Sequence, residues 1–208
     1  MQRIAITGGI GSGKSTLCRM LEREGIPVFY CDTEARALMQ SDESLRRQIE
    51  MLVGSLERDD IRGFLADGPH QAERLNSLVW PRVAQEWKAF CQRYEERDVP
   101  VVVMECALLF ESGFEGLADI SILVTAPTVL RRQRVSQRDG LSAEKIDSIM
   151  ALQMPEEEKC RRATHILNNI GTPEELLDAY HRLQLSTFNS QLSTLNFQLS
   201  TDKKWKHA

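Results

Sequence analysis

The chain has 208 residues, of which 42% are hydrophobic and 27% charged, a composition that excludes disordered and collagen-like proteins. Its formal net charge of −4 argues against a general nucleic-acid-binding protein. Five scattered cysteines without a CxxC pair exclude a disulfide framework and a zinc module, and they are typical of a reducing compartment. Because no apolar run approaches about 18 residues and no signal-peptide pattern is found, we expect a soluble, cytoplasmic protein without membrane contact.

In chain order, the first elements are a strand, a glycine-rich loop and a helix. We expect the strand over 3–7 and the helix over about 14–24, where Gly25 and Pro27 mark its end. A second strand follows over 27–30, and apolar runs predict further strands over 99–104, 120–125 and 164–168. Short strands that alternate with helical patterns predict an α/β fold with a five-stranded parallel sheet.

The segment between the second and third strands is too long for a single crossover helix and reads as helical nearly throughout. One apolar stripe at helical spacing comprises Val83, Trp87, Phe90 and Tyr94, on a helix that Pro81 should open or kink. Thr172, Pro173 and Glu175 form a capping box that opens the last helix.

These patterns divide the chain into four parts. We predict a core over 1–35, 82–130 and 163–183, a helical subdomain inserted over 36–81 and a second helical insertion over 131–162. A seven-residue repeat marks a C-terminal tail over 184–208, for which a helical extension and a low-complexity tail both stay open.

The segment 8–15, GGIGSGKS, matches the Walker A pattern GxxxxGK[ST] between a predicted strand and a predicted helix. Glycines let such a loop point several backbone N–H groups at phosphate oxygens, and the following helix adds its positive N-terminus. Lys14 would reach the β- and γ-phosphates, and the hydroxyl of Ser15 would bind Mg²⁺. The expected nucleotide-binding residues are Gly8, Gly9, Gly11, Ser12, Gly13, Lys14, Ser15 and Thr16. No NKxD sequence follows, which favours ATP over GTP.

Two carboxylates follow predicted strands. Asp32 ends the second strand, which we expect beside the first; it would take the proton from an attacking hydroxyl or cap a helix that begins at Thr33. Glu105 ends the third strand and would hold Mg²⁺ or simply close the strand at the surface. The neighbouring Cys31 and Cys106 are interpreted as small core residues rather than nucleophiles.

Arginines recur on one face of the helix that follows Pro127. Arg131, Arg134 and Arg138 are three and four residues apart, in a chain that is acidic overall. Such a row is typical either of a lid that neutralises a triphosphate or of a solvated helix face.

Several segments together resemble the dephospho-CoA kinase family: TGGIGSGKST, CDTEAR, LNSLVWP, ALLFESGF, RQRVSQRDGLS and the turn at Asn169. The resemblance covers about 1–183. It implies a P-loop kinase-like, three-layer fold, with a substrate domain near 36–81 and a lid over 131–162. It places Asp32 as the base, Arg138 in a lid arginine position and Asn169 near the adenine. Trp80 stands where many members have histidine, so no polar substrate contact is assigned to it.

The resemblance implies transfer of the γ-phosphate of ATP, with Mg²⁺, to the 3′-hydroxyl of dephospho-CoA. Lys14, Arg138 and Asp32 would act in catalysis, Arg134 and Asn169 with the loop would bind ATP, and Ser15 and Glu105 would hold the metal. We expect a monomer or weak homo-oligomer. A P-loop kinase for another small alcohol or nucleotide and a non-catalytic nucleotide-binding module stay open as alternatives.

Overall fold

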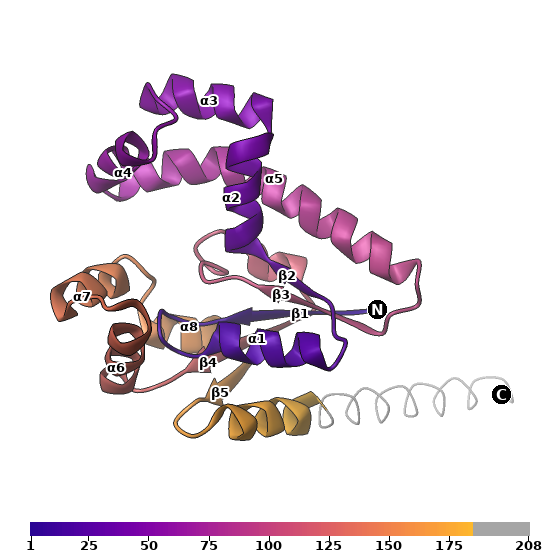
Figure 1. Cartoon of the computed structure of the whole chain (residues 1–208). Helices are drawn as coiled ribbons and strands as arrows, with labels where there is room; N and C mark the ends of the chain where they lie inside the picture. Colours follow the sequence, from indigo (N-terminus) through magenta and orange to yellow (C-terminus); the bar gives the residue numbers. More distant parts are fainter. Residues whose placement is uncertain (185–208) are drawn as a thin grey trace, which may run out of the picture. The chain divides into compact units, whose positions relative to one another are not determined.

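A computed structural model describes residues 1–184 of the chain, so the repeat predicted from Gln184 onward lies almost wholly outside the described residues. The five predicted strands form one sheet in which all neighbours are parallel (Figure 1). They are β1 (Gln2–Thr7), β2 (Val28–Tyr30), β3 (Val101–Glu105), β4 (Ile120–Thr125) and β5 (His165–Asn168). The order is β2-β3-β1-β4-β5. The second strand therefore pairs with the third, and the expectation that it lies beside the first is wrong.

Helices α2 to α5 fill the long segment between β2 and β3 and gather on one side of the sheet in Figure 1. Their bounds are Cys31–Ser41, Glu43–Val53, Arg58–Ala66 and Pro69–Glu95. The last of them, α5, has 27 residues and contains Pro81 in its interior. Pro81 thus does not open this helix, because Pro69 takes the first helical position, where a missing N–H group costs nothing.

The remaining helices surround the carboxyl ends of the strands or connect them. They are α1 (Lys14–Arg23), the short 3₁₀ helix η1 (Phe114–Leu117), α6 (Thr128–Asp139), α7 (Ala143–Ala151) and α8 (Glu156–Arg162). Gly140 ends α6 in a left-handed conformation, and the Ser142 side chain caps α7 at the Lys145 N–H group. Figure 1 shows α6 and α7 beyond the ends toward which the strands point, where open α/β sheets bind their ligands.

Alternate residues of the central strands pack on opposite faces of the sheet. Ala5, Val102 and Met104 belong to one buried cluster with Val83 and Trp87 of α5. Aromatic rings extend this cluster, since Phe90 lies 5.4 Å from the ring of Phe29 and 4.8 Å from that of Tyr94. The predicted apolar stripe is confirmed as the face of α5 that covers the sheet. Ile4, Ile6 and Val103 are equally buried but lie outside this cluster, as the two-residue period of a strand requires.

The described part of the chain divides into two compact units, one over residues 1–170 and one that begins at Gly171. The second unit opens with the predicted capping box, which is confirmed: the Glu175 N–H group donates to Thr172 Oγ1 at 3.2 Å, and Thr172 N–H donates to Glu175 Oε2 at 2.9 Å. Helix then continues over 173–184. Within residues 1–184, no helix combines the length and the apolar character needed to cross a bilayer.

Candidate nucleotide-binding and catalytic site

The glycine-rich loop joins β1 to α1, in the context that the Walker A pattern requires. The loop folds back on itself, with Ser12 N–H donating to the Gly9 carbonyl at 3.1 Å. In the described structure, no side chain caps α1 and its first turn holds no acidic residue. The N-terminal N–H groups of α1 therefore have no anionic side chain competing for them, which is the arrangement that receives a phosphate group.

Lys14, Ser15 and Glu105 meet at the carboxyl edge of the sheet. Ser15 Oγ donates to Glu105 Oε1 at 3.1 Å, and the Lys14 ammonium lies 3.4 Å from the same oxygen. Glu105 is the last residue of β3 and is 4% exposed, so the alternative that it closes a strand at the surface is wrong. A carboxylate is stable at this depth because a lysine and a hydroxyl satisfy it.

A cavity of about 180 Å³ lies between the loop, α1 and α6. It is lined by Gly9, Gly11, Gly13, Lys14, Ser15, Thr16, Arg19, Arg134, Val135 and Arg138. The structure thus brings the two predicted arginines of α6 to the loop, which argues against a merely solvated helix face. Arg138 also forms a two-pronged ion pair with Asp139, at 2.6 and 2.8 Å.

Arg134 lines this cavity and has a side-chain donor without an acceptor among residues 1–184. Its Nη1 is buried and has no hydrogen-bond partner within residues 1–184, while its Nη2 donates to Asn169 Oδ1 at 3.4 Å. A buried cationic donor without a partner is expensive unless a ligand completes it. The cavity therefore fits a polyanion such as a nucleotide polyphosphate.

Asn169 is tied to the loop as well as to Arg134. Its side-chain N–H donates to the Ser12 carbonyl at 2.7 Å, and its backbone N–H donates to the Thr125 carbonyl at 2.7 Å. Asn169 thereby connects the end of β5 with the loop and with β4. Its predicted position near an adenine stays a prediction.

One site arginine, Arg19, was missed at the sequence level, whereas Arg131 belongs to the predicted arginine row and is buried against the loop. Arg19 lines the cavity and lies four residues after Ser15, so the helical period of α1 could have revealed it. Arg131 is 6% exposed, and its Nε donates to the Ile10 carbonyl at 2.9 Å while its Nη1 pairs with Glu156 at 3.1 Å. Its guanidinium covers Gly9 so closely that a Cβ atom there would lie 2.1 Å from Arg131 Nη2.

Asp32 is the second residue of α2 and is half-buried. The helix begins at Cys31 and its N-cap is Tyr30, so the alternative that Asp32 caps a helix from Thr33 is wrong. Among the described residues, its side chain has no hydrogen-bond or ion-pair partner, and only its backbone carbonyl accepts a bond, from Arg36. Tyr30, the last residue of β2, pairs with Glu105 of β3. Asp32 follows Tyr30 by two residues, so it lies near the same edge of the sheet as Glu105.

Cys31 and Cys106 are fully buried free thiols beside these carboxylates. A hydrogen bond with Cys106, together with burial, raises the pKa of the Cys31 thiol far above its ordinary value. A protonated buried thiol is a poor nucleophile. The interpretation of both residues as core is confirmed.

A Walker A loop on a five-stranded parallel sheet, with lysine, serine and carboxylate at one point and arginines on a facing helix, defines a protein of the P-loop kinase class. A family model of dephospho-CoA kinases matches residues 2–175. The chain belongs to the dephospho-CoA kinase family, and it is an enzyme that transfers phosphate from ATP.

Individual relatives agree with this assignment. A dephospho-CoA kinase from Salinibacter ruber is 39% identical over 184 residues, which cover 85% of this chain and 92% of that protein. A crystal structure from Thermus thermophilus has a TM-score of 0.74 and 37% identity and covers 89% of this chain and 97% of its own. A dephospho-CoA kinase from Campylobacter jejuni shares the fold at a TM-score of 0.63 and 22% identity, covering 91% of this chain and 100% of its own.

Proposed function

We propose that the chain transfers the γ-phosphate of ATP to the 3′-hydroxyl of dephospho-CoA, giving ADP and coenzyme A. The observation that carries the proposal is the contact of Lys14 and Ser15 with Glu105 next to the loop. At the same edge of the sheet lies Asp32, whose side chain has no partner among residues 1–184. Lys14 and the loop amides would bind a triphosphate. The carboxylate of Asp32 would bind the hydroxyl group of an alcohol.

ATP would lie with its phosphates on residues 8–16, inside the cavity that Arg134 and Arg138 line. Lys14 would leave Glu105 and bind the β- and γ-phosphates. A phosphate oxygen would accept a hydrogen bond from Arg134 Nη1, which has no partner within residues 1–184. Arg138 sits at the rim of the cavity and would neutralise charge on the transferred group when the predicted lid over 131–162 closes.

The oxygen donors of Ser15 and Glu105 fit Mg²⁺. This ion prefers hard oxygen ligands and combines one or two carboxylates with substrate phosphates and waters. Residues 1–184 contain no cluster of three or more histidine, cysteine or carboxylate ligands, so the protein supplies only part of the coordination sphere. When bound, Mg²⁺ would neutralise charge on the β- and γ-phosphates.

Asp32 would accept the proton of the 3′-hydroxyl as its oxygen bonds to the γ-phosphorus and the bond to ADP breaks. The helical segment 36–81 would hold the rest of the acceptor. In support, α5 and the segment after β3 enclose a cavity of about 480 Å³, bordered by Trp80 and Phe114, whose rings lie 5.4 Å apart. Free cysteines and the acidic net charge support a cytoplasmic enzyme that needs neither nucleic acid nor membrane. Self-association stays a prediction.

The acceptor is tested by release of ADP in the presence of dephospho-CoA, shikimate, gluconate or a nucleoside monophosphate. We expect turnover with dephospho-CoA and only background with the other three. Faster turnover of another alcohol would show that this alcohol, and not dephospho-CoA, is the acceptor. Release of ADP at the same rate without any acceptor would instead support a nucleotide hydrolase.

The role of Asp32 is tested by Asp32→Asn. We expect kcat to fall by at least about 100-fold while affinity for ATP stays unchanged, because the variant keeps its shape but cannot take a proton. Steady-state ADP release and a titration with ATP measure the two quantities. Glu34→Gln is the matched control, since it neutralises another carboxylate in the first turn of α2, and it should keep normal turnover. Wild-type kcat in Asp32→Asn would remove Asp32 from catalysis.

A further inference from the structure

Lys159 of α8 is buried to an extent that is unusual for a lysine. Its side chain is 1% exposed, and within residues 1–184 its ammonium nitrogen has no hydrogen-bond partner. The carboxylate of Glu111 lies 3.7 Å away, but Glu111 Oε1 already accepts a hydrogen bond from the Met154 N–H group at 2.8 Å. An ammonium group desolvated in this way costs several kcal/mol unless strong acceptors replace its water. Among residues 1–184, the ion-pair partner of Lys159 is the Glu111 carboxylate at 3.7 Å, which is too far for a strong hydrogen bond.

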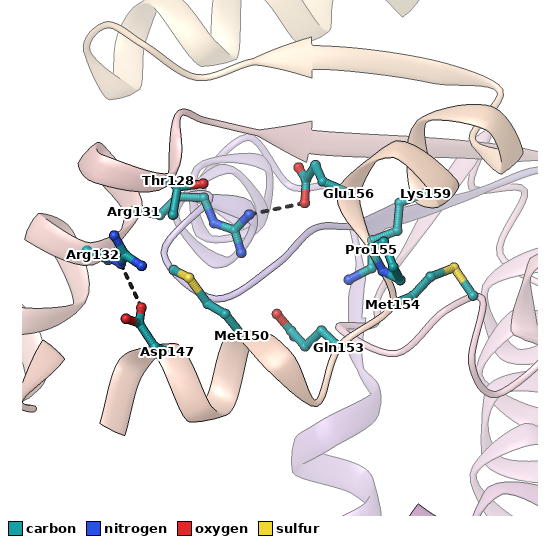
Figure 2. A pocket seen from close by; sticks show the side chains of 10 residues that line it. All are labelled: Thr128, Arg131, Arg132, Asp147, Met150, Gln153, Met154, Pro155, Glu156 and Lys159. Atoms are coloured by element: carbon teal, nitrogen blue, oxygen red, sulfur yellow. Dashed lines mark hydrogen bonds and ion pairs between the residues drawn. The ribbon is translucent and has the colours of Figure 1, made fainter. Parts of the chain in front are cut away.

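Lys159 borders a cavity of about 340 Å³ that is enclosed by α6, α7 and α8 (Figure 2). The other cations of the cavity already have partners. Arg131 pairs with Glu156 at 3.1 Å, and Arg132 pairs with Asp147 at 2.6 Å, as the dashed lines in Figure 2 show. Of these three cations, Lys159 is the one whose ammonium group has no hydrogen-bond acceptor within residues 1–184.

The cavity adjoins the phosphate-binding loop. Two of its lining residues hold the backbone of Ile10: Arg131 donates to the Ile10 carbonyl at 2.9 Å, and Gln153 accepts from the Ile10 N–H group at 3.0 Å. Burial lowers the pKa of Lys159, and the positive charges of Arg131 and Lys14 lower it further, against the opposing effect of Glu111 and Glu156. Arg131 lines this cavity, and its guanidinium covers Gly9 of the nucleotide cavity, so the two cavities lie on either side of Arg131.

We propose that Lys159 is a second phosphate-binding lysine, whose ammonium contacts the γ-phosphoryl group of bound ATP and stabilises its charge during transfer. The inference rests on the proposed placement of ATP on the loop, but it is independent of the acceptor. A γ-phosphate oxygen would supply the strong acceptor that Glu111 supplies poorly. The contact would be absent from ADP, which lacks that group.

The test compares two nucleotides with the variant Lys159→Met, which keeps the length of the side chain and removes its charge. One charge-assisted hydrogen bond corresponds to about 10- to 100-fold in affinity. Calorimetric titration with Mg²⁺ should therefore show that affinity for β,γ-imido-ATP falls by at least about tenfold while affinity for ADP is unchanged. Lys159→Arg should recover most of the loss, because it restores the charge.

Arg132→Met is the matched control, since it removes an exposed, paired cation from the same cavity and should leave both affinities unchanged. Thermal unfolding verifies that each variant is folded, and Lys159→Gln replaces Lys159→Met if the latter does not fold. Equal affinities of wild type and variant for the imido analogue, or an equal loss for both nucleotides, would overturn the inference. Because no acceptor is present in these titrations, a wrong acceptor assignment would leave their result untouched.

Discussion

At the scale of single residues, Gly11 is a loop position that has no room for a side chain. Its φ of +77° lies in the left-handed region, and an added Cβ atom would lie 2.5 Å from the backbone carbonyl oxygen of Arg131 and 2.9 Å from Val135 Cγ2. Backbone atoms cannot swing aside as the end of a flexible side chain can. The absence of a side chain at Gly11 is therefore what lets α6 approach the loop and carry its arginines to the phosphates.

We expect Gly11→Ala to lose at least about tenfold in affinity for ATP and to lower stability by about 1–3 kcal/mol, because both the backbone strain and the clash displace the loop from α6. Titration with ATP and chemical unfolding measure the two effects. Gly54→Ala is the control: Gly54 has a φ of +88° with no atom near the added Cβ, so this variant should lose about 1 kcal/mol and no ATP affinity. Normal ATP binding by Gly11→Ala would show that the close approach of α6 is dispensable.

The burial of Glu105 changes the chemical role that can be inferred for it. In the sequence it is a carboxylate after an apolar run, compatible with a surface strand end. In the structure, parallel pairing with β1 and β2 buries it between Ile6 and Tyr30, where Lys14 and Ser15 are its polar partners. Its chemical role follows from these neighbours, which come from distant parts of the chain.

At the scale of elements, Asp42 connects two helices of the insertion. It caps α3 by accepting from Leu45 N–H at 2.9 Å, and its other oxygen accepts from Arg82 Nε of α5 at 2.9 Å. The Leu45 hydrogen bond, followed by the contacts with Arg82, lowers the pKa of Asp42 below its ordinary value. A carboxyl group with a lowered folded-state pKa stabilises the fold above its unfolded-state pKa, and this stabilisation disappears as the pH falls through the folded-state value.

Asp42→Asn isolates the charge, because asparagine caps helices as well as aspartate does. We expect the variant to have a lower Tm than wild type at pH 7, and we expect this difference to shrink as the pH falls below the ordinary carboxyl pKa of 3.8 and Asp42 becomes protonated. Thermal unfolding followed by circular dichroism at several pH values measures it. A Tm difference that stays constant across this range would show that the carboxylate charge does not connect α3 with α5.

The segment 128–162 is hydrogen-bonded to the phosphate-binding loop at Ile10. Both backbone polar groups of Ile10 are hydrogen-bonded. Its carbonyl accepts from Arg131 of α6, and its N–H group donates to Gln153, which follows α7. One of the two contacts therefore comes from α6, the helix that also lines the nucleotide cavity. This contact provides a physical connection between movement of these helices and the geometry of the loop.

At the scale of the whole molecule, nucleotide binding should be visible as global stabilisation. A ligand present at 100 times its Kd stabilises the folded state by about 2.7 kcal/mol, which for a chain of this size raises Tm by about 5–10 °C. We expect such a rise for the wild type with Mg²⁺ and ATP, and none for Lys14→Ala at the same concentration. Differential scanning calorimetry gives both values, and an equal rise in Lys14→Ala would contradict the assignment of the loop.

The sequence by itself determined the five strands, the phosphate-binding loop and the capping residues of two helices, Ser142 and Thr172. These features depend on local rules: glycines permit a tight loop, apolar runs form buried strands, and Ser142 or Thr172 caps the helix that directly follows. The family resemblance likewise rested on short segments, each readable without knowledge of its neighbours in space.

Only the tertiary structure decided which of these segments meet. Examples are the pairing of β2 with β3, the burial of Glu105 against Lys14, and the hydrogen bonds that connect Arg131 and Gln153 with the loop, all of which join residues far apart in the chain. Sheet order and side-chain burial arise from packing the whole core at once, so no local pattern encodes them. For this reason the phosphate-binding loop and the arginine row of α6 were predictable from local spacing, whereas the place of Arg19 in the cavity and the partners of Arg131 became apparent only in the folded chain.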